Sequence, residues 1–222
     1  MSKTAIHLDN ISLRFGSQAL FTNLTLDIED KKITAIQGRS GSGKSSLLQV
    51  INGLIQPDQG SVFHFGEQMN YHNIYKTRMN IGYAVQQVGL FPHLTVYENI
   101  TLPGRLAHWT PEENDTRARE LMALVSLDEH HKQKYPHQIS GGEQQRVGIC
   151  RSIFLNPRIL LLDESFSSLD EETKEEIHTE VIKLQQMEPR CIVMVTHDPK
   201  EAGKLGDHRI KLDQGQLYHM QS

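Results

Sequence analysis

The sequence has 222 residues, of which 37% are hydrophobic and 23% charged, and its formal net charge is -4. This length suits one well-packed domain, with or without a small appended subdomain. The longest apolar runs, such as residues 159–162 and 191–195, are far shorter than the roughly 20 residues of a membrane-spanning helix. The basic residues are scattered, which disfavours nucleic acid as the main partner. We therefore expect a single domain over residues 1–222, without a membrane span and without a nucleic-acid partner.

The first residues of the chain lack the apolar stretch of a secretory signal. Both cysteines, Cys150 and Cys191, lie inside apolar segments, which predicts buried free thiols in a reducing compartment. We therefore expect a cytoplasmic protein.

The first third of the chain predicts strands and then one helix. Residues 6–15 and 24–28 alternate between apolar and polar side chains on either side of a Gly-Ser turn, which indicates antiparallel strands. Residues 33–37 form a short β-prone run that leads into the glycine-rich segment 38–43. Residues 44–52 then show helical periodicity and stop at a glycine. The order is strand, loop and helix.

The middle of the chain changes from strand signals to helix signals. Residues 61–65 and 81–85 are strand candidates, but from residue 96 to residue 154 only helix signals remain. Thr110 and Glu113 form a capping box, with a proline at the first helical position between them. We expect an inserted helical subdomain over approximately residues 90–154.

Strand signals return at residues 159–162 and 191–195, separated by a charged helix at residues 171–187. Strands that alternate with helices are typical of a parallel α/β core. The predicted fold class is therefore α/β, with an N-terminal antiparallel β subdomain and the helical insert.

A phosphate-binding loop is the first motif that carries chemistry. The segment from Gly38 to Ser45 fits G-x-x-x-x-G-K-S and lies between a predicted strand and a predicted helix. Such a loop wraps backbone N–H groups around phosphates, with Lys44 on the β- and γ-phosphates and Ser45 on Mg²⁺. The alternative, a flexible Gly/Ser turn, is disfavoured by this setting. The expected nucleotide-binding residues are Gly38, Arg39, Ser40, Gly41, Ser42, Gly43, Lys44, Ser45 and Ser46.

An acidic pair, Asp163 and Glu164, follows the apolar run 159–162. Open α/β sheets bind their ligands at the carboxyl ends of such strands. Asp163 can hold the hydrated Mg²⁺, and Glu164 can orient or deprotonate an attacking water molecule. Taken alone, the pair would more often cap a helix or lie in a solvated turn, but the upstream phosphate loop favours the catalytic interpretation.

The segment at residues 140–146 separates the families that share a phosphate loop. It reads Ser140, Gly141, Gly142, Glu143, Gln144, Gln145 and Arg146. Together with the phosphate loop, Asp163-Glu164, the segment 167–170 and Thr196-His197-Asp198, it resembles the ATP-binding cassette (ABC) superfamily in motif order and spacing over nearly the whole chain. From the residues alone, Ser140 and Glu143 form a capping box that opens an apolar helix.

The resemblance implies a P-loop NTPase (RecA-like) core. It also implies roles for residues outside the phosphate loop and the acidic pair. Gln86, with Gln87 as the alternative, would sense Mg²⁺ and water. His197 would bond to the γ-phosphate, and Phe15 would stack on adenine. On composition alone, both His197 and Phe15 would more often be structural.

The resemblance also implies that two copies complete each site. Ser140, Gly141 and Gly142 would contact the γ-phosphate held by the opposite subunit, and Asp170 would lie in a loop that communicates across the dimer. Catalysis would then use Glu164, His197, Gln86 and Lys44 of one subunit.

The sequence departs from the family pattern at three positions. Ile139 replaces the usual Leu, Glu143 replaces the commoner Gln, and Ser165 stands where Pro often follows the catalytic Glu. We expect the negative charge of Glu143 to weaken the binding of the opposite subunit's γ-phosphate slightly.

Residues 81–100 and the segment beginning at Trp109 resemble bacterial uptake cassettes for osmoprotectants and quaternary amines. This resemblance implies an ATPase subunit that drives a separate integral membrane permease from the inner face of the cell membrane, with docking near residues 91–97. A second ABC subunit, expected to be identical, and a substrate-binding protein are the further candidate partners. A lipid or lipoprotein exporter is the alternative, followed by a DNA-repair or translation ATPase and by a kinase.

The scattered histidines invite a metal-site hypothesis. His130, His131 and His137 show no convergent ligand spacing, and the first two precede a Tyr-Pro pair. We therefore expect a solvated loop here.

Overall fold

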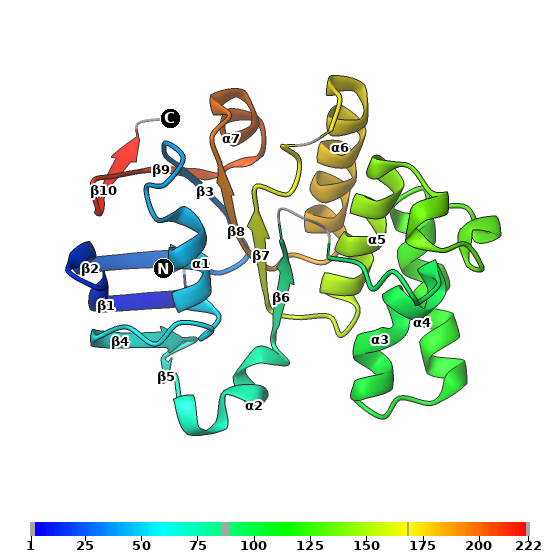
Figure 1. Cartoon of the computed structure of the whole chain (residues 1–222), viewed down its shortest axis with the longest axis horizontal. Coiled ribbons are helices and arrows are strands. Elements are labelled where there is room, and N and C mark those ends of the chain that lie inside the picture. Colours follow the sequence, from blue (N-terminus) through cyan, green and yellow to red (C-terminus); the bar gives the residue numbers. More distant parts are fainter. Residues whose placement is uncertain (1–2, 86–88, 168, 221–222) are drawn as a thin grey trace.

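The structure is a computed structural model that describes residues 3–85, 89–167 and 169–220. The described strands form a four-stranded sheet in the order β2-β1-β4-β5 and a six-stranded sheet in the order β10-β9-β3-β8-β7-β6. Figure 1 shows the smaller sheet at one end of the molecule and the helices α3 and α4 at the other.

The four-stranded sheet is antiparallel and uses the N-terminal part of the chain. Its strands are β1 (Thr4–Phe15), β2 (Gln18–Glu29), β4 (Gln59–His64) and β5 (Glu67–Gln68). The prediction of antiparallel strands at the start of the chain is therefore confirmed.

The six-stranded sheet has a parallel core, in which β3, β8, β7 and β6 pair in the same direction. β9 adds in parallel to β3, and β10 adds antiparallel to β9. The strands are β3 (Ile33–Gln37), β6 (Ile81–Ala84), β7 (Ile159–Asp163), β8 (Cys191–Thr196), β9 (His208–Asp213) and β10 (Gln216–Met220). This sheet confirms the α/β fold class, whereas β9 and β10 were not predicted.

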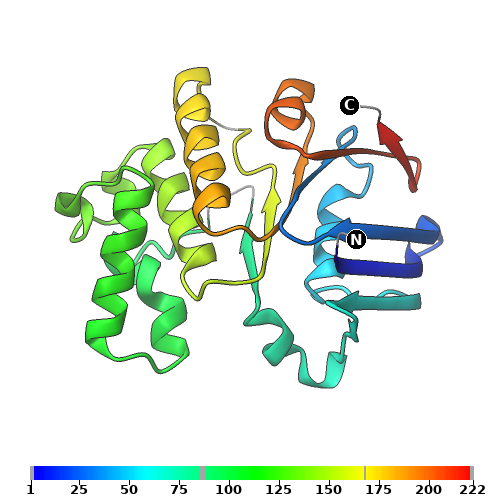
Figure 2. The same ribbon diagram turned by 180° about the vertical axis from the view of Figure 1, so that it is seen from behind.

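The helices surround the six-stranded sheet and include a group of three between β6 and β7. The α-helices are α1 (Lys44–Ile51), α2 (Ile74–Arg78), α3 (Val96–Leu106), α4 (Pro111–Leu124), α5 (Gly141–Ile153), α6 (Glu171–Met187) and α7 (Pro199–Leu205). Short 3-10 helices span Tyr71–Asn73, Glu129–His131 and Pro136–Gln138. Figure 2, seen from behind, again shows α3, α4 and α5 on the side away from β1 and β2.

The core consists of two hydrophobic clusters on opposite faces of the parallel strands. In β7, Leu160 and Leu162 pack with α3, α5 and α6, whereas Ile159 and Leu161 pack with α1 and the N-terminal strands. Successive side chains of a strand point to opposite faces, so this alternation is the expected result of a strand buried on both sides. It follows that α1 and α5 lie on different faces of the sheet.

None of the helices formed by the described residues combines the length and the hydropathy of a membrane span.

His64, in β4, gives the fold an expected pH dependence. Burial lowers the pKa of His64 from 6.5 to about 4, and a hydrogen bond with the Ile51 backbone offsets part of this shift. The folded protein therefore holds the ring neutral, and between pH 6.5 and pH 4 the unfolded chain binds the extra proton. The contribution of the neutral His64 ring to the free energy of unfolding is fully present above pH 6.5 and is lost as the pH falls toward 4. The free energy of unfolding should fall by at most about 2 kcal/mol between pH 7 and pH 5.

Urea unfolding at pH 7 and pH 5 measures this loss. We expect His64→Leu to lose less stability between the two pH values than the unsubstituted protein. The matched control is His219→Gln in β10, a strand whose His219 is exposed. A His64→Leu variant with the full pH dependence of the unsubstituted protein would contradict the assignment.

Candidate active site

The loop between β3 and α1 approaches its surroundings too closely for side chains at some positions. A Cβ on Gly38 would lie 2.5 Å from the Ser42 Oγ atom and 2.6 Å from the Leu212 backbone oxygen. Gly43 has a φ of +97°, which side-chain-bearing residues rarely adopt. The Ser42 hydroxyl is buried and has no hydrogen-bond partner. The loop is therefore a tight backbone cradle with a polar atom available to a ligand.

The N-terminus of α1 is open to an anion. Its cap residue is Gly43, no side chain caps it, and its first turn contains no acidic residue. In contrast, α3 and α4 begin with capping boxes, at Thr95 and Thr110. An uncapped helix start presents backbone N–H groups and a partial positive charge, which together favour phosphate. These features fit the phosphate groups of a nucleotide.

Lys44 is a buried cation within this loop. Its side chain is 4% exposed, and its ammonium group donates hydrogen bonds to the backbone oxygens of Gly38 at 3.0 Å and Arg39 at 3.1 Å. The same nitrogen lies 3.1 Å from a carboxylate oxygen of Glu164. The phosphate loop and the acidic pair therefore meet at this side chain.

Asp163 is held by two hydroxyl groups. The Ser45 hydroxyl donates to one carboxylate oxygen at 2.8 Å, and the Tyr83 hydroxyl donates to the other at 2.9 Å. Burial and the negative charge of Asp163 raise the pKa of Tyr83, so its phenol stays protonated and remains a donor. Hydroxyl and carboxylate oxygens are the ligands that Mg²⁺ prefers. The Ser45 and Asp163 pair therefore fits the predicted metal.

Glu164 lies between Lys44 and His197. One of its carboxylate oxygens is near Lys44, and the other lies 3.5 Å from His197 Nδ1. Its backbone has a φ of +44° and its N–H donates to the Val195 oxygen, so the neighbouring strand holds a left-handed turn. Such conformations in residues other than glycine cluster at functional sites. The geometry suits a carboxylate that receives a proton from a group bound beside it and His197.

Other predicted site residues lie apart from this group or outside the described residues. Gln86 and Gln87 fall in the latter class. Phe15, at the end of β1, is 55% exposed, so its ring is free to stack on a ligand. Asp170 caps α6 and accepts hydrogen bonds from the Thr173 N–H at 3.0 Å and hydroxyl at 2.8 Å.

The signature helix α5 begins with the predicted capping box. The Ser140 N–H donates to Glu143 at 2.7 Å, and the Glu143 N–H donates to the Ser140 hydroxyl at 3.3 Å. A Cβ on Gly142 would lie 2.5 Å from the Thr173 methyl group, so the start of α5 packs closely against the start of α6. Because α1 and α5 occupy opposite faces of the sheet, no contact among the described residues joins Ser140 to Lys44.

The expectation of a solvated loop is wrong for His131. This side chain is 8% exposed, and its Nε2 atom lies 2.8 Å from a Glu143 oxygen. Burial raises the pKa of Glu143, but hydrogen bonds from Ser140 and the neighbouring His131 outweigh burial and lower it overall. Asp128, His130 and His131 also place one possible metal-ligand atom each within 4.8 Å of one another. Hydrophobic patterning gave no sign of the His131–Glu143 pair, which depends on the fold of residues 129–139.

The other departures from the family pattern fit without distortion. The hydroxyl of Ser165 is buried and donates to the Ala84 backbone oxygen at 3.1 Å, which joins the end of β7 to the end of β6. Ile139 is 8% exposed and belongs to the cluster beneath α5.

Replacing Glu143 by Gln tests its predicted effect on anion binding. An amide oxygen can still accept the Ser140 N–H, so the variant removes the charge and keeps the cap. We expect ATP-dependent dimerisation to strengthen by about two- to fivefold, because a charge beside a helix end contributes about 0.3–1 kcal/mol. Dimer dissociation constants in MgATP measure this effect.

The control is Glu113→Gln, since Glu113 forms the same capping box with Thr110 at the start of α4. Equal dimer affinities for Glu143→Gln and the unsubstituted protein would count against the predicted effect.

Comparison with known proteins identifies the family of the chain. A family model described as ABC transporter matches residues 21–167. The chain is 38% identical over 96% of its length to the glycine betaine uptake system ATP-binding protein YehX of Escherichia coli (strain K12), and it spans 69% of that protein. It is also 38% identical over 95% of its length to the choline transport ATP-binding protein OpuBA of Bacillus subtilis (strain 168), of which it spans only 55%.

A solved structure of an ATP-binding cassette matches the fold over nearly the whole chain. The ATP-binding cassette MJ0796, in a dimeric post-hydrolysis state bound to ADP and Pi, is 32% identical and superposes with a TM-score of 0.87 over 98% of this chain and 99% of that one. The chain therefore belongs to the ABC transporter family, as one of its ATPase subunits.

Proposed function

We propose that the chain hydrolyses MgATP at sites shared by two copies and that this cycle drives a membrane permease for solute import. One observation carries the proposal: Lys44, Ser45, Asp163, Glu164 and His197 converge at one edge of the sheet, whereas the start of α5 lies on the other face. The site of one chain thus lacks the contribution of Ser140 that the family resemblance requires.

The phosphate loop binds the nucleotide in this proposal. The backbone N–H groups of residues 38–46 and the Lys44 ammonium group hold the phosphates, and Phe15 stacks on the adenine ring. Ser45 and Asp163 hold Mg²⁺, with Gln86 as a further ligand. When bound, Mg²⁺ neutralises phosphate charge and orients the terminal phosphate. Tyr83 keeps the Asp163 carboxylate oriented through the hydrogen bond at 2.9 Å.

Glu164 and His197 act on the water molecule. Glu164 orients it and accepts its proton as the oxygen attacks the terminal phosphorus in line with the leaving oxygen. His197, whose Nδ1 atom lies 3.5 Å from the Glu164 carboxylate, bonds to the terminal phosphate beside the water. The lysine and histidine nitrogens around Glu164 fix the direction of its carboxylate.

The second copy completes the site. Ser140, Gly141 and Gly142 at the start of its α5 contact the terminal phosphate, and Asp170 lies beside the dimer contact at the start of α6. The close packing of Gly142 on Thr173 holds these two helix starts side by side. We propose a homodimer, in which the whole chain acts as one ATPase domain with α3–α5 as the helical insert.

A groove between α2, β6, α3 and α5 is the proposed docking site of the permease. Tyr75 and Leu106 are each 63% exposed and line it together with Arg151. The Arg151 guanidinium lies 5.8 Å from the Phe91 ring centre and donates to the Gly89 oxygen at 2.9 Å. Arg151 therefore joins the groove to Phe91, at the start of the predicted docking segment 91–97. Docking there would place the chain on the inner face of the membrane.

The names of the relatives support import of a small solute, since they include uptake systems for glycine betaine and choline. We propose a quaternary-amine osmoprotectant as the solute class and a substrate-binding protein as the component that delivers it.

Reconstitution with the co-purified membrane component in vesicles tests this function. We expect ATP inside the cytoplasmic compartment to drive accumulation of radiolabelled betaine on that same side. ATP-driven movement away from the ATP side would support export, and ATPase activity stimulated by nucleic acid instead of by the membrane component would overturn the transport proposal.

A further inference from the structure

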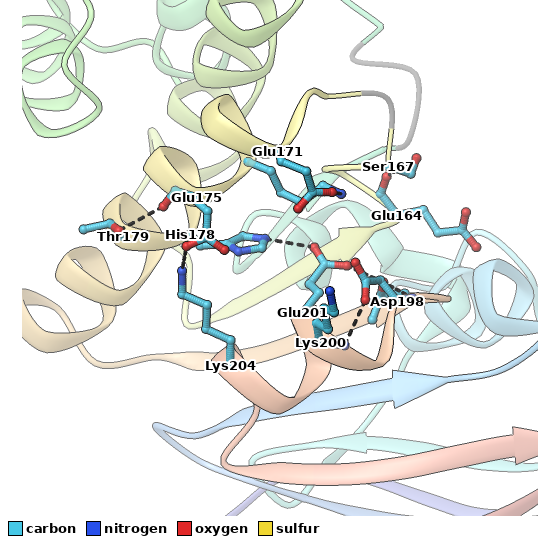
Figure 3. A network of polar contacts seen from close by, with 12 residues as sticks. Glu164, Ser167, Glu171, Glu175, His178, Thr179, Asp198, Lys200, Glu201 and Lys204 are labelled. Carbon is cyan, nitrogen blue, oxygen red and sulfur yellow. Dashed lines mark hydrogen bonds and ion pairs between the residues drawn. The ribbon is translucent and has the colours of Figure 1, made fainter.

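A chain of buried polar groups joins α6, α7 and the end of β8. The Nε2 atom of His178 lies 3.2 Å from one carboxylate oxygen of Glu201, and the other oxygen accepts a hydrogen bond from the Thr196 hydroxyl. The exposed fractions of His178, Glu201 and Thr196 are 2%, 7% and 2%. Figure 3 shows the His178 ring of α6 directed at the Glu201 carboxylate of α7.

The Thr196 hydroxyl is both a hydrogen-bond donor and a hydrogen-bond acceptor. It donates to Glu201, and its oxygen accepts the Asp198 N–H at 3.0 Å. The side chain of Asp198 in turn accepts the Lys200 N–H at 2.8 Å and caps α7. His197 lies between Thr196 and Asp198, so these bonds hold the backbone on both sides of it.

The other end of this chain of polar groups, at His178, contacts the segment that follows Glu164. The His178 ring packs edge-on against the ring of Phe166, with centroids 5.2 Å apart and planes at 81°. Phe166 follows Glu164 by two residues, and α6, which carries His178, begins immediately after Asp170. The polar chain therefore contacts the elements that carry Glu164, Asp170 and His197.

Packing alone does not account for these side chains. A buried carboxylate that must be paired contributes no more stability than well-packed apolar residues of similar volume, and it often contributes less. What a buried carboxylate bonded at both oxygens does provide is direction, because it orients each group that it bonds to. Here the fixed donor is the hydroxyl next to His197.

We propose that Glu201, supported by His178, is a positioning residue that acts through Thr196 to hold His197 opposite Glu164. This proposal rests on the proposed role of His197 in hydrolysis. Glu201 fixes the Thr196 hydroxyl proton toward itself, which leaves the hydroxyl oxygen to accept the Asp198 N–H. His178 fixes Glu201 and ties the turn around His197 to α6.

Steady-state ATPase measurements on Thr196→Val and Thr196→Ser, made on the full dimeric ATPase, test the proposal. The valine keeps the volume and removes the hydroxyl, whereas the serine keeps the hydroxyl. We expect Thr196→Val to lower kcat by about tenfold with KM within about twofold, because small displacements of a catalytic group cost rate more than binding. Thr196→Ser should recover most of kcat. Equal kcat values for Thr196→Val and the unsubstituted protein, or equal losses for valine and serine, would overturn the proposal.

Thr179→Val is the matched control. Thr179 lies on the exposed face of α6, and its hydroxyl bonds to the Glu175 backbone oxygen at 2.9 Å. We expect it to leave kcat unchanged, and a loss equal to that of Thr196→Val would show a general effect of helix packing and overturn the proposal.

A second variant covers the case in which Thr196→Val does not fold. Glu201→Gln keeps the size of the side chain and one acceptor oxygen but removes the charge, and we expect at least about a threefold lower kcat with unchanged KM. An unchanged kcat would overturn the proposal.

The inference and the proposed function fail in different ways. If the unsubstituted protein shows no ATPase activity, or if His197→Ala keeps its full kcat, the proposed role of the site is wrong. If His197→Ala loses activity while Thr196→Val and Glu201→Gln keep it, the site assignment stands and only the positioning chain is wrong.

Discussion

Glu164→Gln is expected to lower the ATP hydrolysis rate by about 10²–10⁴-fold while ATP binding is retained. The amide cannot accept the proton of the attacking water, but its oxygen can still accept a hydrogen bond from Lys44, which lies 3.1 Å from the native carboxylate. The left-handed turn and the bond to Val195 do not depend on the side chain, so the backbone should keep its place. Phosphate release and ATP titration calorimetry measure the two quantities.

The control for this variant is Glu120→Gln, since the Glu120 side chain is 58% exposed on α4 and pairs with Arg117. We expect it to hydrolyse ATP at the rate of the unsubstituted protein. A Glu164→Gln variant that keeps more than about a tenth of the rate would assign proton transfer to another group.

Lys44→Ala is expected to weaken ATP binding by about 100-fold or more. The substitution removes the single buried ammonium group that lies inside the phosphate loop, and charge-assisted bonds to phosphate contribute about 1.5–3 kcal/mol each. It also leaves Glu164 and the backbone oxygens of Gly38 and Arg39 without their bonds to this cation. Calorimetric titration with MgATP gives the dissociation constant, and thermal unfolding shows whether the fold persists.

Lys32→Ala is the control for loss of a lysine charge. Lys32 is 47% exposed and pairs with Asp207 at 3.2 Å near the start of β3. We expect its ATP affinity to equal that of the unsubstituted protein. Tight ATP binding by a folded Lys44→Ala variant would contradict the assignment of the loop as the phosphate site.

The sequence predicted those elements whose signals are local. The charged helix over residues 171–187 has the expected bounds in α6, because Asp170 caps it and its apolar positions recur at helical spacing. β10 escaped prediction because it is exposed at most positions and shows no regular alternation. β9 does alternate over Ile210 and Leu212, but its apolar signal covers only two positions. The seven-residue helix α7 is too short to give a clear period.

The site residues that belong to a sequence motif were predicted. A site residue whose contact depends on the pairing of two strands was missed. The order of motifs brought Lys44, Asp163, Glu164 and His197 into one hypothesis, and these side chains do lie together in the structure. Tyr83 was missed because its bond to Asp163 depends on the parallel pairing of β6 with β7, which are separated by the whole helical segment. Only a structure could supply that register.

The positioning chain was missed for the same reason. His178, Thr196 and Glu201 come from three elements, and nothing in their spacing marks them as neighbours. The sequence shows only a histidine, His178, within a helix of mixed charge, and a single histidine is most often structural.

The central claim is that two copies complete each nucleotide site, and sedimentation of the Glu164→Gln variant tests it most directly. The account predicts monomers without nucleotide and dimers with MgATP, and it predicts that a further Ser140→Arg substitution prevents the dimer. A Glu164→Gln protein that binds MgATP but stays monomeric at high concentration, even with its membrane component supplied, would contradict it.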